Sequence, residues 1–369
     1  MIRILHLGDL HLGSPFFAFS PRAAATRRAR QLEALEALLD RALLGGVQLL
    51  LLAGDCFDTE APDPDTVQRF FALLGKCGVP VVIAPGNHDP YRPGGLWERF
   101  SLPQNICLFR EEALALFELP ALGVNVYGYA FTGDTHKAPA LPCREELPRE
   151  RINILLAHGD MLTPDSPYAP ITAGALAASG FAYAALGHIH KRTEPRRFGD
   201  TVVAYSGFFA GRGFDEVGEG NANLVQIDGS RVTVTPLETA ADRFEIYKLD
   251  CTGDASGEDV RQRAASFLQN TPIPTGSAVR LVLCGEVGVS CTPDTVAIAR
   301  LGEAYALFEV KDETLPVYDR TFLERDPGLR GAFYRAMQPR LNSEDLEERA
   351  VAAEALRMGL AALSGRELL

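Results

Sequence analysis

The stretch from residue 79 to residue 89 most constrains the fold of this chain. Residues 79–83 form an apolar, β-branched run that predicts a strand buried on both faces, as in a parallel sheet. A Pro-Gly pair then breaks the strand, and Asn87, His88 and Asp89 stand where the chain leaves the sheet. Ligands of open α/β sheets bind outside the carboxyl ends of the strands. A plain turn is the alternative, and the rest of the chain decides between the two.

The first part of the chain alternates between buried strands and helices. Strands are expected at residues 2–8, 47–53 and 79–83. A helix is expected from residue 22 to residue 44, where apolar residues recur at helical spacing, and a second helix begins at Pro64. This order implies right-handed crossovers and therefore a parallel α/β core.

The remainder of the chain is expected to form further strands and then two smaller parts. The strands are expected at residues 152–157, 181–186, 201–205, 223–227 and 232–235. We expect domains at residues 1–238 and 243–315, the second a small α/β unit, and a helical region at residues 316–369. Ser343 is expected to cap a final helix with Glu344 and Asp345 in its first turn. Its expected apolar stripe is Leu346, Ala350, Ala353, Leu356, Leu360 and Leu363.

Composition excludes several classes of protein. No apolar run approaches the roughly 20 residues of a membrane helix, so no membrane partner is expected. The seven cysteines are scattered and odd in number, which favours reduced thiols and a cytoplasmic location over a disulfide framework. A net charge of −12 argues against a general electrostatic grip on nucleic acid. It leaves room for a nucleic-acid enzyme whose metal ions supply local positive charge.

Five predicted strands end in side chains that bind metals. These side chains are Asp9, His11, Asp55, Asn87, His158, His188 and His190. Residues two apart in extended chain point to the same side, so Asp9 with His11, and His188 with His190, can each chelate one ion. A single histidine at a strand end is usually structural. Five such ends on one sheet edge favour a metal site instead.

The ligand types indicate which metals and which chemistry to expect. Imidazole, carboxylate and amide ligands without thiolate suit manganese, iron or zinc better than calcium. Seven ligands are too many for one ion, whereas two divalent ions that share Asp55 would use all of them. Such a pair, about 3.5–4 Å apart, stabilises the attacking and leaving oxygens of a phosphoryl displacement.

The order DxH, GD, GNHD, H and GHxH resembles the calcineurin-like metallophosphoesterase superfamily, and the resemblance covers about residues 1–235. Many members of the superfamily have Gly before the histidine that corresponds to His158, but here Ala157 precedes it and Gly159 follows it. A histidine followed by Gly resembles the DNA-repair nuclease branch. The strings GDLHLGSPF at residues 8–16 and YSG at residues 205–207 are similar to those of bacterial YhaO-type exonuclease-like proteins, relatives of the SbcD nuclease subunit.

The resemblance implies a fold and a role for each residue. The fold is a four-layer β-sandwich flanked by helices, with the small α/β unit as a capping domain and C-terminal helices. One metal would be held by Asp9, His11, Asp55 and His190, and the other by Asp55, Asn87, His158 and His188. His88 would protonate the leaving oxygen or stabilise the transition state, with Asp89 orienting it. The alternative for Asp89 is a cap of the following turn. Arg212 is a candidate for contact with a substrate phosphate.

The sequence therefore predicts a two-metal phosphodiesterase that hydrolyses DNA, with manganese as the expected ion, acting as a DNA-repair exonuclease. A phosphodiesterase or phosphatase of small molecules or nucleotides is the first alternative, and a non-catalytic, metal-containing interaction module is the second. The resemblance also implies an ATPase partner of the structural-maintenance type, for which the helix at residues 343–363 is the candidate contact. Packing of that helix on its own domain is the alternative, and a homodimer is left open.

Overall fold

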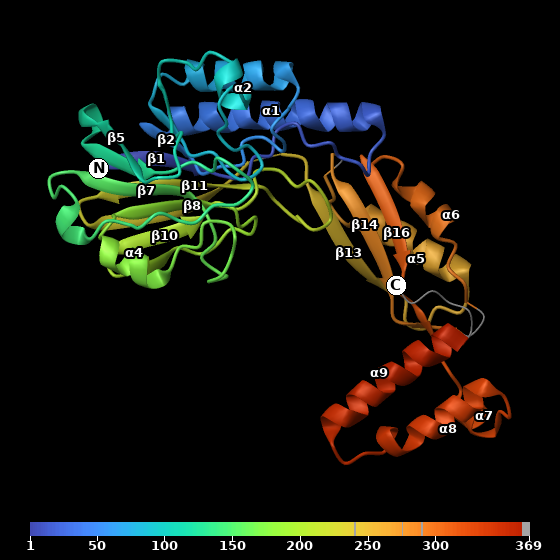
Figure 1. The fold of residues 1–369 in the computed structure, drawn as a ribbon. Helices are drawn as coiled ribbons and strands as arrows, with labels where there is room; N and C mark the ends of the chain where they lie inside the picture. Colours follow the sequence, from blue (N-terminus) through green and yellow to red (C-terminus); the bar gives the residue numbers. More distant parts are fainter. Residues whose placement is uncertain (240, 275, 289–290, 364–369) are drawn as a thin grey trace. The chain divides into compact units, whose positions relative to one another are not determined.

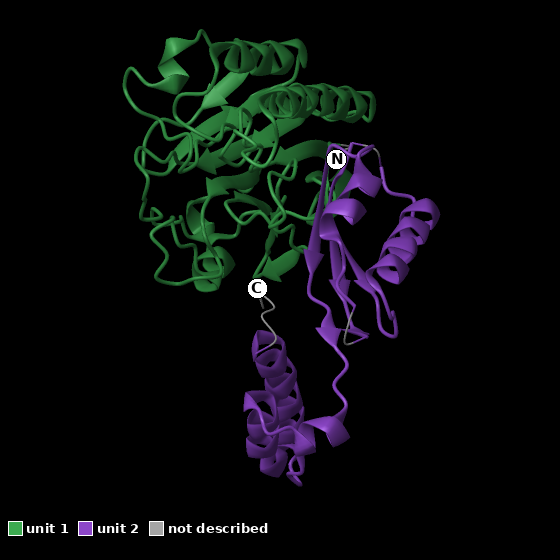
Figure 2. Cartoon of the chain, turned by 90° about the vertical axis from the view of Figure 1, so that its right-hand side faces the viewer, with its two compact units in different colours: residues 1–244 green, residues 245–369 purple. Residues whose placement is uncertain are grey.

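The computed structural model describes residues 1–239, 241–274, 276–288 and 291–363. The chain divides into two compact units, Met1–Phe244 and Glu245–Leu369 (Figure 2). The division into three domains that the sequence suggested stays a prediction. In the described ranges, every helix is too short or too polar to cross a membrane.

Unit 1 contains two six-stranded sheets (Figure 1). The first sheet has the order β12-β11-β1-β2-β3-β4, and the second has the order β5-β6-β7-β8-β10-β9. The first consists of β1 (Ile2–Leu7), β2 (Leu49–Leu52), β3 (Val81–Ile83), β4 (Ile106–Leu108), β11 (Asn221–Asp228) and β12 (Arg231–Glu238). The second consists of β5 (Ala115–Leu119), β6 (Val124–Gly128), β7 (Ile152–His158), β8 (Tyr183–Gly187), β9 (Arg196–Phe198) and β10 (Thr201–Tyr205). Strands β1 to β4 are parallel, as are β6, β7, β8 and β10.

Strand alternation explains the four layers. In β1, Leu5 and Leu7 pack in the core under the helices, whereas Ile2 and Ile4 face the second sheet. The two sheets thus share one apolar core, to which Ile154 of β7 belongs. The outer faces are covered by helices α1 (Pro21–Leu44) and α2 (Pro64–Lys76) on the first sheet and α4 (Ala173–Ser179) on the second. The predicted α/β fold of sheets flanked by helices is confirmed.

The two long helices of unit 1 begin and end at residues that their sequence specifies. The Ser20 hydroxyl accepts a hydrogen bond from the Ala23 backbone N–H, and Pro21 opens α1. The Asp63 carboxylate caps α2 in the same way through the Thr66 N–H. Gly46, with φ of +78°, follows the end of α1 in the left-handed region that glycine favours. Short elements connect these parts: α3 (Leu96–Arg99), η1 (Pro120–Leu122) and η2 (Arg144–Glu146).

Unit 2 begins with a small sheet and two helices. The sheet has the order β13-β14-β16, from β13 (Phe244–Asp250), β14 (Ala278–Cys284) and β16 (Leu307–Asp312). Beside it lie α5 (Gly257–Asn270), α6 (Thr295–Ala299) and η3 (Arg300–Gly302), and β15 (Glu286–Val287) pairs with β17 (Leu315–Pro316). Val260 and Ala264 of α5 pack on Leu281 and Leu283 of β14, which gives this part its own core.

Three further helices follow within the described residues of unit 2: α7 (Arg320–Arg325), α8 (Leu329–Leu341) and α9 (Leu346–Leu363). The predicted cap of the last helix is wrong by two residues. The helix begins at Leu346, and the Asp345 carboxylate accepts from the Glu347 N–H, while Ser343 lies before the helix.

The predicted apolar stripe of α9 is correct only at its centre. Leu356 and Leu360 pack against Leu323 and Tyr334, whereas Leu346 is 72% exposed. Ala350, Ala353 and Leu363 are exposed as well, and Ala352 and Ala361 are buried in their place. The buried face has shifted because only the middle of α9 meets α7 and α8.

Candidate metal centre

The carboxyl ends of the parallel strands of both sheets meet at one edge of unit 1. The predicted ligands lie there: Asp9 and His11 follow β1, Asp55 follows β2, Asn87 follows β3, His158 ends β7, and His188 and His190 follow β8. Side-chain contacts of 3.0–3.9 Å join six of them across the two sheets. His188 is joined to the others by its ring, 5.2 Å from that of His158, and by its backbone N–H, which donates to Asp9.

Backbone strain is concentrated at these ligands. In the described part of the chain, six non-glycine residues have positive φ, and four of them are Asp9 (52°), His11 (45°), Asp55 (49°) and His188 (100°). Each such conformation costs about 1–3 kcal/mol and persists only where the surroundings enforce it. The strain indicates that the backbone is bent to aim these side chains inward.

Glycines allow the close approach of the strand ends. A Cβ on Gly86 would lie 2.1 Å from Asp55 Oδ1, and a Cβ on Gly187 would lie 1.9 Å from the Ala53 carbonyl oxygen. Any larger residue at either position would therefore push the ligand-bearing turns apart. This is the physical reason for glycine in the GNHD and GHxH strings.

The first group of ligands is Asp9, His11, Asp55 and His190. Their donor atoms all lie within 4.8 Å of one another, and His11 Nε2 lies 3.2 Å from His190 Nε2. A carboxylate lies beside each of the other ring nitrogens: His190 Nδ1 forms a hydrogen bond of 2.6 Å with Glu216 Oε1, and His11 Nδ1 lies 3.2 Å from Asp58 Oδ1. Both Nε2 atoms are thereby left to face the centre. A set of two carboxylates and two oriented imidazoles fits a divalent cation.

The second group lies on the other side of Asp55. His158 Nε2 is 3.0 Å from Asn87 Oδ1 and 3.4 Å from Asp55 Oδ2. His158 Nδ1 lies 2.9 Å from the Ala53 carbonyl oxygen, which can only accept, so Nδ1 carries a proton and Nε2 points to the centre. Asp55 Oδ2 is also 3.6 Å from His11 Nε2, so this one oxygen faces both groups.

The charges of the site follow from burial and pairing. Burial alone would raise the pKa of the Asp55 carboxyl, but His158, His11 and His88 hold it well below its usual range. Burial would lower the pKa of His158, and the adjacent Asp55 raises it to about 9 instead. Burial and the charge of His158 lower the pKa of His188 to about 4. Asp55 is thus an anion between the two groups, and His188 is neutral. An ion bound by His158 would have to displace the proton that Asp55 favours on its ring.

His88 lies beside this cluster and is exposed. Its Nδ1 is 3.0 Å from the backbone carbonyl oxygen of Asp58, and its backbone N–H donates to Asp55 Oδ1 at 2.9 Å. It also borders a surface hollow of about 530 Å³ whose lining includes Asn87 and Tyr168. A ligand in this hollow would meet the imidazole and the ligand cluster together.

The predicted orientation of His88 by Asp89 is wrong. Asp89 is buried, and its carboxylate accepts from the backbone N–H groups of Cys56, Phe57 and Gly86 at 2.7–3.2 Å. The alternative for Asp89, a role in holding the turns, fits these contacts. The Asp58 carbonyl occupies the orienting position instead, because the turn after β2 passes closer to the imidazole.

Sequence reasoning missed two carboxylates, Asp58 and Glu216. Both hold Arg212, whose Nη1 donates to Asp58 Oδ1 at 2.8 Å and whose Nη2 donates to Glu216 Oε1 at 2.6 Å. His190 and Arg212 lower the pKa of Glu216 to about 2, although burial opposes this. The contact of Arg212 with a substrate phosphate stays a prediction. Asp58 lies three residues after Asp55, and Glu216 ends the string GRGFDE at residues 211–216. Neither position in the sequence indicates which side chain the carboxylate contacts.

Comparison with known proteins identifies the family. The sequence model of the calcineurin-like phosphoesterases matches residues 2–192, which is more than half of the chain. The chain belongs to the calcineurin-like phosphoesterase family. The chain therefore belongs to a family of metal-dependent hydrolases, as the resemblance implied, and its candidate ligands lie within the matched residues.

The relatives of this chain include one uncharacterized metallophosphoesterase and two DNA-repair proteins. The chain is 30% identical over 249 residues to the uncharacterized metallophosphoesterase YhaO of Bacillus subtilis, which covers 63% of the chain and 59% of YhaO. It is 28% identical over 217 residues to the DNA double-strand break repair protein Mre11 of Saccharolobus solfataricus, 56% of the chain and 54% of that protein. The same identity holds over 325 residues with Mre11 of Haloferax volcanii, 85% of the chain and 68% of that protein. The match thus spans little more than half the length of the first two relatives.

Proposed function

We propose that this phosphoesterase hydrolyses DNA phosphodiester bonds at a centre of two divalent ions and acts as a DNA-repair exonuclease. The observation that carries the proposal is the position of Asp55, whose Oδ2 lies 3.6 Å from His11 Nε2 and 3.4 Å from His158 Nε2. A carboxylate between two groups of ligands is what a two-ion site requires. The repair proteins among the relatives support the choice of DNA.

The residues divide the chemical work. Asp9, His11 and His190 would hold one ion, Asn87, His158 and His188 the other, and Asp55 both. Bound divalent ions supply hydroxide at neutral pH and neutralise charge on the phosphoryl oxygens. His88 would donate a proton to the leaving oxygen from Nε2 of its imidazolium form, while Nδ1–H stays bonded to the Asp58 carbonyl. Manganese is the proposed ion, since the ligands are imidazoles, carboxylates and one amide.

An assay on several substrates tests the proposal. End-labelled double-stranded and single-stranded DNA, a generic phosphodiester, nucleotide monoesters and cyclic nucleotides would be incubated with the protein and manganese. We expect nucleotides to be released from DNA ends, and chelation to abolish release. Faster turnover of monoesters or cyclic nucleotides than of DNA would contradict the proposal and favour a small-molecule phosphoesterase. No turnover by a protein that retains its metals would favour an interaction module.

We also propose that α9 is the contact for an ATPase of the structural-maintenance type. Its Val351 and Met358 are 65% and 42% exposed and lie seven residues apart, so they share one helix face. We expect Val351→Glu with Met358→Glu to abolish capture of the ATPase in pull-down, and Val296→Glu, an equally exposed position on α6, to leave it intact. Equal capture by both variants would contradict the contact.

A further inference from the structure

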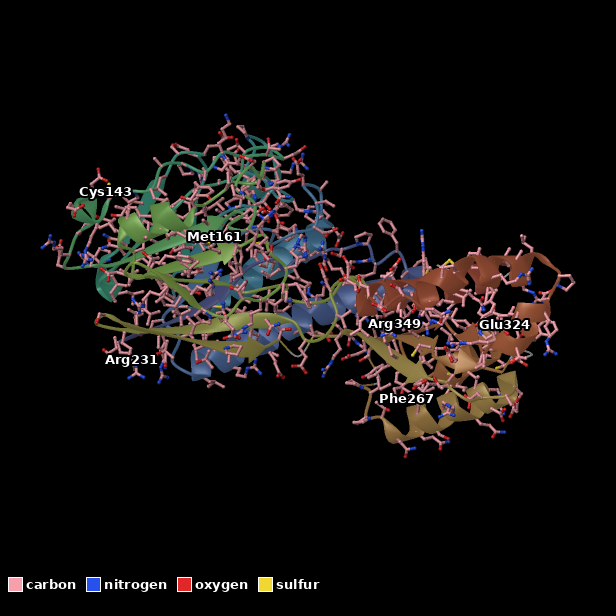
Figure 3. The ribbon with its side chains drawn as sticks, turned by 90° about the horizontal axis from the view of Figure 1, so that it is seen from below. Cys143, Met161, Arg231, Phe267, Glu324 and Arg349 are labelled. Atoms are coloured by element: carbon pink, nitrogen blue, oxygen red, sulfur yellow. The ribbon has the colours of Figure 1, made fainter. Side chains whose placement is uncertain are left out.

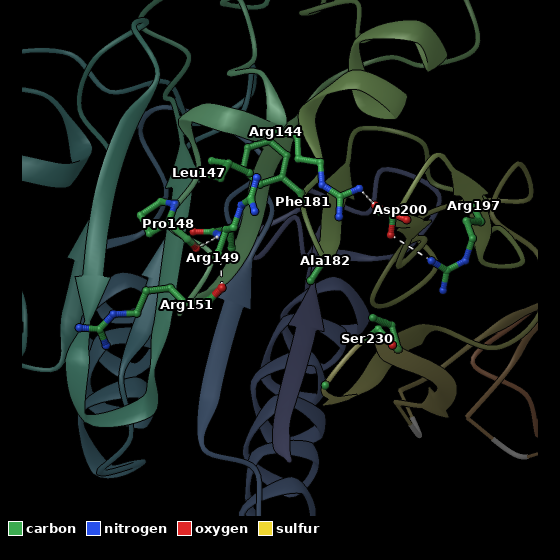
Figure 4. Close-up of a pocket in the computed structure, with 14 residues that line it drawn as sticks. Arg144, Leu147, Pro148, Arg149, Arg151, Phe181, Ala182, Arg197, Asp200 and Ser230 are labelled. Carbon is green, nitrogen blue, oxygen red and sulfur yellow. Dashed lines mark hydrogen bonds and ion pairs between the residues drawn. The ribbon is translucent and has the colours of Figure 1, made fainter.

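A second site lies at the edge of unit 1 opposite the metal centre. Strands β7 and β8 are parallel, so their first residues meet at one edge and their last residues, near His158 and His188, meet at the other. A pocket of about 640 Å³ opens at the first edge (Figure 4). Its walls come from four segments: the loop before β7 with the start of β7, the residues just before β8, β9 with the turn after it, and the β11–β12 turn with the start of β12.

Arginines dominate this pocket. Its charged lining residues are Arg144, Arg149, Arg151, Arg197 and Asp200. Four guanidinium groups thus face one carboxylate in a chain whose net charge is −12. Such a concentration of positive charge against the overall charge of the chain indicates an anionic ligand.

The arginines differ in what already holds them. Arg144 forms an ion pair with the Asp200 carboxylate, and Arg197 Nη1 donates to the Asp200 backbone carbonyl at 3.0 Å (Figure 4). Arg151 Nη1 donates to the Pro120 carbonyl at 3.4 Å. Within the residues that the structure describes, Arg149 has neither a hydrogen bond nor an ion pair. Its donors are therefore available to a ligand.

Buried contacts hold the walls of the pocket in place. The buried Asn153 side chain donates to the carbonyl oxygens of Pro148 and Arg151, which fixes the loop that carries Arg149. Gly180 has φ of +70°, and a Cβ there would lie 2.8 Å from the Arg144 side chain. The loop before β7 also carries Cys143, labelled in Figure 3 together with Arg231 of the β11–β12 hairpin. Asn153 and the close approach of Gly180 thus fix the loop before β7, which carries three of the arginines.

We propose that this pocket binds a nucleoside phosphate. Guanidinium groups match phosphate oxygens in charge and in fork geometry. The volume of about 640 Å³ suits a nucleotide-sized ligand, and the concave shape suits a small molecule better than a nucleic-acid strand, which needs an extended track. Ser230 and Asp200 in the lining supply polar groups for sugar hydroxyls. The site is separate from the metal centre and does not depend on the proposed nuclease activity.

Equilibrium binding of ATP to the full chain tests the proposal. The protein is first treated with a chelator, so that no cation links the nucleotide to the metal centre. Arg149→Glu is expected to weaken ATP binding at least about tenfold, because it removes free donors and adds repulsion. After metal is restored, its phosphodiesterase rate and metal content should equal those of the wild type.

Arg196→Glu is the matched control. The substitution changes the charge by the same amount as Arg149→Glu does. Arg196 precedes Arg197 in β9, but it lies over the Phe198 ring, outside the pocket lining. We expect ATP binding within about twofold of the wild type in this variant. Equal weakening by both variants, or no ATP binding at all, would overturn the site.

Two competitors test the class of ligand. Inorganic phosphate should displace ATP only at much higher concentration than a nucleotide does, and equal potency would overturn the nucleoside part of the proposal. A short single-stranded oligonucleotide should not displace ATP. If the oligonucleotide displaced ATP from the wild type, and Arg149→Glu abolished that displacement, the pocket would be assigned to nucleic acid. The small-molecule proposal would then be overturned.

Discussion

The two edges of the sheets in unit 1 are built in opposite ways. At the carboxyl-end edge, Asp9, His11, Asp55 and His158 are each no more than 1% exposed, and backbone strain and hydrogen bonds aim them. At the opposite edge, the side chain of Arg144, in η2, is 65% exposed, and that of Asp200, on the β9–β10 turn, is 56% exposed. Coordination needs fixed distances, and buried strand ends provide them. Recognition of a charged ligand tolerates mobile side chains, and exposed surface segments can provide them.

Loss of Asp55 should have the largest effect of any substitution at the carboxyl-end edge. Asp55→Ala removes the carboxylate that faces both ligand groups, so phosphodiesterase activity should fall below detection and bound metal should drop. Metal analysis and a phosphodiesterase assay of the purified variant measure these two losses, and circular dichroism checks that the variant is folded. Asp55→Asn is the control that keeps the shape without the charge. Two ions at full occupancy in Asp55→Ala would show that Asp55 does not bridge.

His88 tests whether the exposed residue at this edge serves chemistry alone. His88→Ala should keep both metals and bind DNA, while the cleavage rate falls by about 10²–10⁴, the usual contribution of a positioned acid or base. His190→Ala should instead lose metal, and excess manganese should partly restore its rate. A manganese titration of both variants makes the distinction. If His88→Ala lost an ion or recovered fully with manganese, His88 would be a ligand.

A substitution of Glu216 tests whether metal binding at the carboxyl-end edge depends on carboxylates that contact the ligands without being ligands themselves. Glu216→Gln keeps the size of the side chain but weakens its hold on His190 Nδ1, now 2.6 Å away. We expect affinity for one of two ions to fall about 10–100-fold, with a smaller loss of rate at saturating manganese. Calorimetric titration with manganese measures the two affinities. Unchanged affinities would assign Glu216 to the support of Arg212 only.

Asp89 should have the smallest effect on chemistry and a clear effect on stability. Asp89→Asn replaces one of the two accepting oxygens by an NH2 group that faces a backbone N–H, so we expect a loss of about 1–3 kcal/mol in the free energy of unfolding. The rate per metal-loaded molecule should change little. Denaturant unfolding and an activity assay on the same sample measure both quantities. A large loss of rate with unchanged stability would restore the catalytic role first expected for Asp89.

The sequence predicts the ligands of the carboxyl-end edge because each follows a buried strand directly. Parallel strands bring their ends to one edge, so the position along the chain determines the position in space for Asp9, Asp55 and His158. The same reasoning could not find Glu216, whose contact with His190 depends on how the loop after β10 folds back. Nor could it find the pocket of Arg149, since its walls come from four separate segments.

The prediction for Asp89 failed for a related reason. Adjacency to His88 suggested a contact, but the turn sends the two side chains to different partners. The end of the chain shows the same limit, because Leu346 has the spacing of a buried residue and is 72% exposed. Spacing determines which residues share a helix face. The length of the neighbouring helices determines how much of that face is covered.

Anomalous diffraction from crystals grown with manganese tests the central claim most directly. Two peaks per chain should lie on either side of the Asp55 carboxylate, one near His11 and His190 and the other near Asn87 and His158. A single peak, or two peaks of which neither touches Asp55, would contradict a shared two-metal centre.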